Sequence, residues 1–370
     1  MKNPLKKLWI SAKKKWLIYV VGGFARHRRP PSDPGRKILV IQLASIGDAA
    51  TLIPVCDAVQ QQGWQLDFVC PSGVAPLWRE YFPQSAVYAL SRSDWSAVEE
   101  FRSFPEVHRK QYRAVVVTSI TPVAALLASK VSATVRLGMA ECPRPFKGAR
   151  WLLDDIYCAH PQEHVQKRYR GLFELLVPAL SRVKINRNGH FAAPGSDYVL
   201  LHPGAKWKPR RWPAERFLAI ARELLRRGTP VKILIHEKEE DLLHFFRSDG
   251  LSKDQLIVSR SAEDLIGAVR NAGLLVGNDS GPAHLANLME KLTIVLWGPG
   301  DYHRIRPIGE NVHILIKEIA CRPCRQYRNG DRCELGDNLC LKLISVQEVL
   351  DKIDEVLKTA NVDFPEKRKG

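Results

Sequence analysis

Short apolar runs alternate with longer amphipathic segments along most of this 370-residue chain. Glycine, proline or polar residues bound the runs, a pattern typical of strands buried on both faces of a parallel sheet. The segments between them repeat apolar residues at helical spacing, so helices are expected to join successive strands. The first series of expected strands is Lys37–Leu43, Leu66–Cys70, Ala86–Leu90, Ala114–Thr118 and Thr134–Leu137.

A segment with little apolar content, 183–197, contains Asn, Gly and Pro and predicts an interdomain linker. We therefore expect two α/β domains with a cleft between them, at 37–185 and 196–345, followed by a C-terminal helix and tail at 346–370. The second series of strands is Tyr198–His202, Val231–Ile235, Gln255–Val258, Gly273–Val276, Leu292–Leu296 and Val312–Ile316, with helices at Pro213–Arg227, Lys238–Arg247, Ala262–Asn271 and Ala283–Glu290.

One strand-turn-helix unit, residues 273–290, carries the most suggestive polar turn. Asp279, Ser280 and Gly281 follow the strand at its carboxyl end, where open α/β sheets bind ligands. Gly281 allows close backbone approach, the helix start attracts anions, and His284 lies one turn further on. The alternative is an ordinary Asx-type helix cap with a packing histidine.

A basic loop follows the first strand of the second series. Lys206, Lys208, Arg210 and Arg211 lie close together there, among two tryptophans and two prolines that stiffen the loop. A diphosphate leaving group needs such cations, because negative charge builds on it as its bond breaks. The alternative is a solvated basic loop.

Asp48 is the acidic residue of the turn after the first expected strand, ahead of an expected helix at Ala49–Gln62. At that sheet edge a carboxylate can serve as a general base. It can equally be a helix N-terminal carboxylate stabilised by the helix dipole. The first strand is not followed by G-x-G-x-x-G, so dinucleotide binding is not indicated.

The formal net charge of +17 is concentrated at the start of the chain: residues 1–37 contain eleven Lys or Arg and one acid. This distribution argues against a nucleic-acid-binding protein with one broad basic face. We expect an amphipathic helix on an anionic membrane surface within 1–36, although packing on the protein body or a solvated tail is the alternative. No apolar run reaches the roughly 18 residues that span a bilayer. The apolar stripe would contain Leu5, Leu8, Trp9, Ala12, Trp16, Tyr19 and Val20.

Four of the eight cysteines lie close together near the C-terminal end. Cys321 and Cys324 form a C-x2-C pair, and Cys333 and Cys340 follow at ligand-like spacing. The polar, glycine-containing segment between them suits a loop around an ion, so a structural zinc or iron site is expected. Free thiols are the alternative.

Taken together, these motifs resemble glycosyltransferase family 9, the ADP-heptose:lipopolysaccharide heptosyltransferases. They occur in the order found in that family, and each is weak alone. The matching residues are Gly47-Asp48 with Pro54, His202-Pro203-Gly204 with Arg210–Pro213, Asp279–His284, and Gly298-Pro299 with Asp301.

The resemblance implies a GT-B fold, in which two Rossmann-like parallel-sheet domains face each other across a cleft. It implies that Asp48 is the catalytic base of an inverting, metal-independent transfer. Gln42 departs from the family, where arginine is common, so a phosphate role there is not carried over. The nucleotide-sugar contacts implied by the resemblance are Lys206, Lys208, Arg210, Glu240, Asp279, Ser280, Gly281 and His284.

The expected function is transfer of heptose from ADP-heptose to a lipid-linked lipopolysaccharide core acceptor in a Gram-negative bacterium. The enzyme would act in the cytoplasm, peripherally on the inner face of the inner membrane, with no nucleic-acid partner. The alternatives are a family-9 transferase acting on a protein or another glycan, and a non-catalytic sugar-nucleotide-binding protein at the membrane surface.

Overall fold

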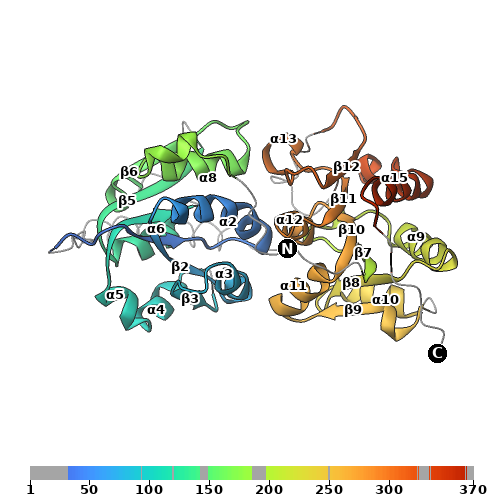
Figure 1. Ribbon diagram of the computed structural model, residues 1–370, viewed down its shortest axis with the longest axis horizontal. Helices are drawn as coiled ribbons and strands as arrows, with labels where there is room; N and C mark the ends of the chain where they lie inside the picture. Colours follow the sequence, from blue (N-terminus) through green and yellow to red (C-terminus); the bar gives the residue numbers. More distant parts are fainter. Residues whose placement is uncertain are drawn as a thin grey trace, which may run out of the picture. The chain divides into compact units, whose positions relative to one another are not determined.

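The computed structural model shows the chain folded into two units, each built around its own sheet. The first comprises Met1–Ser45 and Leu52–Asn186, and the second comprises Ile46–Thr51 and Arg187–Gly370 (Figure 1). The residues that the structure describes are 32–92, 94–118, 121–141, 149–185, 197–248, 251–322, 324, 333, 335–362 and 364.

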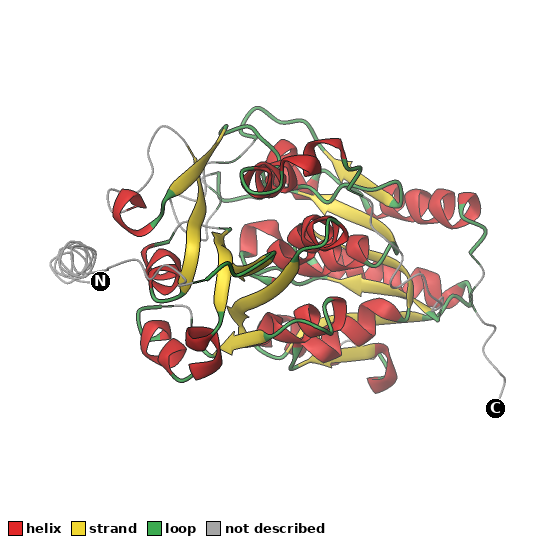
Figure 2. Ribbon diagram, turned by 60° about the vertical axis from the view of Figure 1, so that its left-hand side comes forward, coloured by secondary structure: helices red, strands yellow, loops and turns green. Residues whose placement is uncertain are grey.

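The first unit is built on a six-stranded parallel sheet in the order β3-β2-β1-β4-β5-β6. Most residues of its central strands are fully buried, because helices cover the sheet (Figure 2). The strands are β1 (Lys37–Ile41), β2 (Gln65–Pro71), β3 (Val87–Leu90), β4 (Gln111–Val117), β5 (Ser132–Glu141) and β6 (Asp155–Ala159). The helices are α2 (Ile46–Gln61), of which only Leu52–Gln61 belongs to this unit, α3 (Ala75–Tyr81), α4 (Ala97–Arg102), α5 (Pro105–Arg109), α6 (Pro122–Ser129), α7 (Ala149–Leu152) and α8 (Val165–Glu174), with short 3₁₀ turns at Ser72–Val74 and Pro178–Arg182.

The second unit repeats this design with the order β12-β11-β10-β7-β8-β9. Its last helix, α15, packs through Val349, Ile353 and Val356 into the main apolar core of the unit. The strands are β7 (Tyr198–His202), β8 (Val231–His236), β9 (Leu256–Ser259), β10 (Ala272–Asn278), β11 (Leu292–Trp297) and β12 (Val312–Ile316). The helices are α9 (Ala214–Arg226), α10 (Glu240–Ser248), α11 (Ala262–Arg270), α12 (Gly281–Leu288), α13 (Tyr302–Ile305), α14 (Leu339–Lys342) and α15 (Val346–Thr359), with 3₁₀ turns at Lys208–Arg210 and Lys253–Gln255.

Both sheets have a point at which the strand order reverses. In the first sheet it lies between β1 and β4, and in the second between β7 and β10. Connections leave in opposite directions from such a pair of strands, which opens a crevice at their carboxyl ends where ligands bind. The loops after β7 and β10 therefore border the expected ligand site of the second unit.

The predicted α/β fold with two parallel sheets is confirmed, and each strand predicted from the sequence overlaps an observed strand. The sequence places Asp48 on the turn before the first helix, but it lies in the first turn of α2, which begins at Ile46. The amphipathic helix expected in 1–36 falls almost wholly outside the described residues and stays a prediction. Within the described part of the chain, no helix is long and apolar enough to cross a membrane.

Candidate functional site

The side chain of Asn278 joins the loops on both sides of the β7–β10 switch point. Asn278 is fully buried at the end of β10. Its Oδ1 accepts a hydrogen bond from the Trp212 backbone N–H at 2.9 Å, and its Nδ2 donates to the Pro203 carbonyl at 2.8 Å. The amide therefore fixes both ends of the basic loop relative to the strand that leads to Asp279.

The basic loop contains two arginines with different surroundings. The guanidinium of Arg210 lies over the ring of Trp207 at 4.7 Å, and its Nη1 is 3.2 Å from Asp279 Oδ2. Arg211 donates to the Ala205 carbonyl and to two carboxylates. Lys206 and Lys208 are exposed, and Lys208 Nζ lies 3.5 Å from Asp241 Oδ2.

An acidic residue that the sequence interpretation passed over, Glu239, supports this loop. Its carboxylate accepts hydrogen bonds from the His236 backbone N–H at 3.1 Å and from Arg211 Nη2 at 2.9 Å. A Cβ on Gly204 would meet this carboxylate at 2.4 Å, so glycine is needed for the loop to approach so closely. The predicted contact, Glu240, is exposed at the start of α10, and its role stays a prediction.

The turn after β10 is not an ordinary helix cap. Ser280 occupies the N-cap position of α12, but its side chain makes no capping bond. Its hydroxyl donates instead to the Asn278 carbonyl at 3.1 Å and lies 3.4 Å from His202 Nδ1. Burial lowers the pKa of His202, so this imidazole is neutral at pH 7.

The short segment Ile46–Thr51, which carries Asp48, belongs to the second unit together with the residues of the turn after β10. In that unit, Thr51 Oγ1 lies 3.5 Å from Nδ1 of His284. A Cβ on Gly47 would be 3.3 Å from the Gly281 Cα, so the two backbones are close. Asp48 and His284 are both partly exposed. The structure thus groups the predicted base with the predicted donor turn, while Lys206 and Glu240 lie exposed to solvent.

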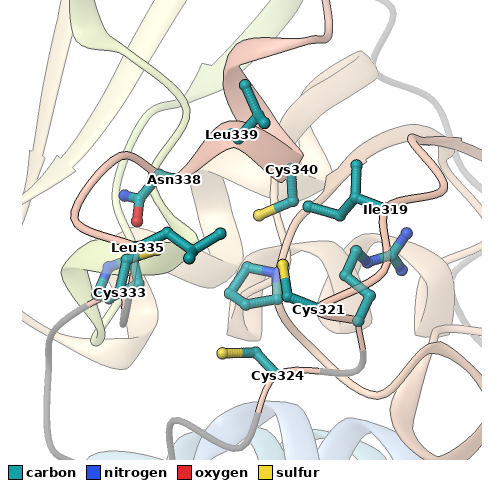
Figure 3. A pocket seen from close by; sticks show the side chains of 11 residues that line it. Ile319, Cys321, Cys324, Cys333, Leu335, Asn338, Leu339 and Cys340 are labelled. Atoms are coloured by element: carbon teal, nitrogen blue, oxygen red, sulfur yellow. The ribbon is translucent and has the colours of Figure 1, made fainter.

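The four clustered cysteines line one pocket of the second unit, and Figure 3 shows the sulfur atoms of Cys321, Cys324 and Cys340 turned toward the same space. Burial raises the pKa of Cys340 to about 11. Burial also acts on Cys333, but backbone N–H groups of the following turn outweigh it and lower its pKa. Among the described side chains, no group of three or more His, Cys, Asp or Glu is arranged to hold a metal ion. The other lining residues are Pro209, Pro299, Ile319, Arg322, Leu335, Asn338 and Leu339.

Comparison of the sequence with known proteins identifies relatives. Residues 101–333 match the sequence model of glycosyltransferase family 9 (heptosyltransferase). Lipooligosaccharide heptosyltransferase 2 of Campylobacter jejuni is 23% identical over 45% of this chain, and the match spans only about half of that protein, 53%. Lipopolysaccharide heptosyltransferase 1 of Escherichia coli O18:K1:H7 is 23% identical over 77% of this chain and 91% of that protein.

Solved structures show the same fold. E. coli heptosyltransferase WaaC with ADP-2-deoxy-2-fluoro heptose superposes with a TM-score of 0.64 at 19% identity, covering 86% of this chain and 99% of that one. The iron-containing dodecameric glycosyltransferase TibC from enterotoxigenic E. coli superposes with a TM-score of 0.51 at 12% identity, covering 90% of this chain and 78% of that one. The two parallel sheets described above are therefore those of a GT-B heptosyltransferase fold.

Proposed function

The chain belongs to glycosyltransferase family 9, the heptosyltransferase family, and we propose that it transfers heptose from ADP-heptose to a lipopolysaccharide core acceptor. The observation that carries this proposal is the grouping of a basic loop and an acidic turn at the β7–β10 switch point. Such a site has cations for a diphosphate and polar groups for a nucleotide-sugar.

The proposed transfer is a single displacement. An acceptor hydroxyl attacks the anomeric carbon from the face opposite ADP, which inverts that centre. The hydroxyl must lose its proton as the new bond forms, and we assign this proton to the carboxylate of Asp48. Asp48 is partly exposed in the first turn of α2, so an acceptor can reach it. A positioned base of this kind contributes about 10²–10⁴-fold to the rate.

The leaving diphosphate gains negative charge as the glycosidic bond to it breaks. We assign its stabilisation to the guanidinium of Arg210, with Lys206 and Lys208 as exposed cations on the same loop. The amino-terminal end of α12, which begins at Gly281, supplies a further favourable dipole. The sequence has no Asp-x-Asp motif of the kind that holds a catalytic divalent ion, so we propose a metal-independent reaction.

The assay that tests this proposal measures ADP release from ADP-heptose, alone and with purified lipopolysaccharide core. We expect release that depends on the core acceptor. Release only with a protein or another glycan would instead support the second acceptor class. ADP-heptose binding without release to any acceptor would contradict an enzymatic function and favour a non-catalytic sugar-nucleotide-binding protein.

We also propose that the four clustered cysteines hold a structural iron or zinc ion. Thiolates are ligands that both metals accept, and all four line one pocket. The iron-containing structural relative shares the fold. Because no three described side chains are already arranged as a metal site, binding would require these thiols to move together. Elemental analysis of the purified protein, compared with a Cys321→Ser, Cys324→Ser variant, tests this: equal metal content would contradict the proposal.

A further inference from the structure

Asp279 has an unusual position for a carboxylate at a ligand-binding sheet edge. Its side chain is only 2% exposed, and Oδ2 accepts no hydrogen bond within the described structure. This oxygen lies 3.2 Å from Arg210 Nη1, an ion-pair contact without hydrogen-bond geometry. Burial raises the pKa of Asp279 to about 6, and the charge of Arg210 opposes that rise. The carboxylate thus depends on Arg210 for electrostatic compensation.

The turn after β11 covers the Asp279 carboxylate on another side. A Cβ on Gly300 would lie 2.3 Å from Asp279 Oδ2, so the backbone of Gly300 packs directly against this oxygen. The indole N–H of Trp297 donates to the Gly300 carbonyl at 2.9 Å and fixes the turn in that place. A sugar hydroxyl has no open approach to Asp279 Oδ2 in this arrangement.

Arg210, in contrast, retains access to solvent. Its side chain is 14% exposed and lies between the Trp207 ring and the Asp279 carboxylate. The loop that carries it is fixed at Trp212 by Asn278. A guanidinium has five N–H donors in a rigid plane, so it can keep one carboxylate partner while it binds phosphate oxygens.

We propose that Asp279 is a positioning residue, which holds the guanidinium of Arg210 toward the donor diphosphate and does not itself contact the sugar. This inference rests on the proposed function, since it assumes a nucleoside diphosphate donor. A long arginine side chain loses rotamer entropy when a ligand fixes it. A buried carboxylate fixes it before the donor arrives, so the phosphate meets a preorganised cation.

Calorimetry with ADP and with ADP-heptose separates positioning from direct sugar contact. The proteins to compare are the full-length wild type, Asp279→Asn, Arg210→Gln and the double variant, with Asp351→Asn as a matched charge removal on the exposed face of α15. We expect Asp279→Asn to weaken the binding of ADP and of ADP-heptose equally, by about 10- to 100-fold. This is the contribution of one charged hydrogen bond, here the bond between Arg210 and a phosphate oxygen. The double variant should bind no more weakly than Arg210→Gln, and Asp351→Asn should bind like the wild type.

Four results would overturn the proposal. If Asp279→Asn keeps its affinity for ADP and loses affinity only for ADP-heptose, Asp279 contacts the sugar. If Asp279→Asn weakens binding equally in the presence and in the absence of Arg210, Asp279 acts through the general structure of the turn. Melting curves and circular dichroism would then show the accompanying loss of fold. If the wild type binds neither ligand, the proposed function fails and this inference fails with it. Unchanged affinity of Asp279→Asn in a binding-competent protein refutes the positioning role alone.

Discussion

At the scale of single residues, two adjacent arginines of the basic loop differ in the partners of their charges. Arg211 is 2.9 Å from both Glu239 Oε1 and Asp241 Oδ2, so its charge is compensated inside the protein. Arg210 pairs with a carboxylate oxygen that has no hydrogen bond of its own in the described structure, and it faces Trp207. We therefore expect Arg210 to bind phosphate and Arg211 to maintain the shape of the loop.

The role of Asp48 can be tested by a nearly isosteric change. Asp48→Asn removes the basic oxygen and should lower turnover by about 10²–10⁴-fold, because the acceptor proton then has no carboxylate to receive it. The affinity for ADP, measured by calorimetry, should stay within about twofold of the wild-type value. Turnover near the wild-type rate would rule out Asp48 as the base.

Asp279 predicts a distinct dependence of stability on pH. Its pKa of about 6 in the folded protein is above the ordinary value of 3.8, so between pH 4 and 6 the folded protein binds this proton more readily than the unfolded chain. The free energy of unfolding should therefore lose about 3 kcal/mol from this group as the pH rises from about 3 to 7, most of it between pH 4 and 6.

The comparison of wild type with Asp279→Asn isolates this effect. The free energy of unfolding of the variant, measured by urea at several pH values, should increase relative to that of the wild type as the pH rises from about 4 to 6, and level off above about pH 7. A constant difference between the two proteins over this range would show that Asp279 does not titrate there. The matched Asp351→Asn variant should show no such trend, because Asp351 is exposed.

Residue-scale chemistry was the part of the site that the sequence predicted least well. The turn Asp279–His284 and the basic loop stand out in the sequence, because their charges and glycines are clustered locally. Asn278 and Glu239 were missed, because their partners lie 66 and 28 residues away at Trp212 and Arg211. Such partners are chosen by the sheet topology, which a local pattern does not contain.

At the scale of elements, hydrophobic patterning predicted strands well wherever both faces are buried. β7, in which all five residues are buried, has the predicted bounds, Tyr198–His202. The edge strand β12 also has its predicted bounds, Val312–Ile316, because its sequence is an almost continuous aliphatic run. β6 was not predicted, since its sequence, Asp-Ile-Tyr-Cys-Ala, lacks the continuous aliphatic run that marks the other strands. Two helices begin earlier than expected, at Ile46 and Gly281, because their first turns contain glycine and polar residues that the apolar pattern does not detect.

The connection between β10 and the basic loop gives a prediction at this scale. Asn278→Ala would leave the Trp212 N–H and the Pro203 carbonyl buried without their partner. Each such group costs about 1–3 kcal/mol, so we expect a loss of about 2–6 kcal/mol in the free energy of unfolding, together with weaker ADP binding. Urea unfolding and calorimetry measure the two effects.

A matched substitution in the same unit should have the opposite effect on stability. Gly267 lies inside α11, and a Cβ there would meet nothing within 4 Å. Gly267→Ala should therefore stabilise the protein by about 0.5–1 kcal/mol, the difference in helix propensity, and leave ADP binding unchanged. If Asn278→Ala were as stable as Gly267→Ala, the amide would not be what fixes the loop.

At the scale of the whole molecule, the two units use the same strand order, and polar residues lie at the carboxyl ends of the central pair of strands in each. In the second unit these are His202 at the end of β7 and Asp279 after β10; in the first, Gln42 follows β1 and Thr118 follows β4, and all four are buried. The sequence predicted this duplication, because the alternation of strands and helices restarts after the linker. It could not predict which side chains would be buried at each switch point.

The basic N-terminal segment, residues 1–36, gives a prediction about the whole molecule, because it concerns attachment to a membrane surface. Removing residues 1–35 takes away nine of the eleven Lys or Arg found in residues 1–37 and the expected apolar stripe. Each cation near an anionic leaflet contributes about 1 kcal/mol, so even part of this set would dominate attachment. The truncated protein should therefore stay active on a short, water-soluble acceptor and no longer sediment with anionic vesicles.

High salt should weaken vesicle binding of the full-length chain by screening these charges, and neutral vesicles are the control. Since the proposed acceptor is anchored in lipid, attachment would raise the effective concentration of enzyme beside it. Equal sedimentation of the two proteins at low salt would assign the extension to packing on the protein body or to a solvated tail.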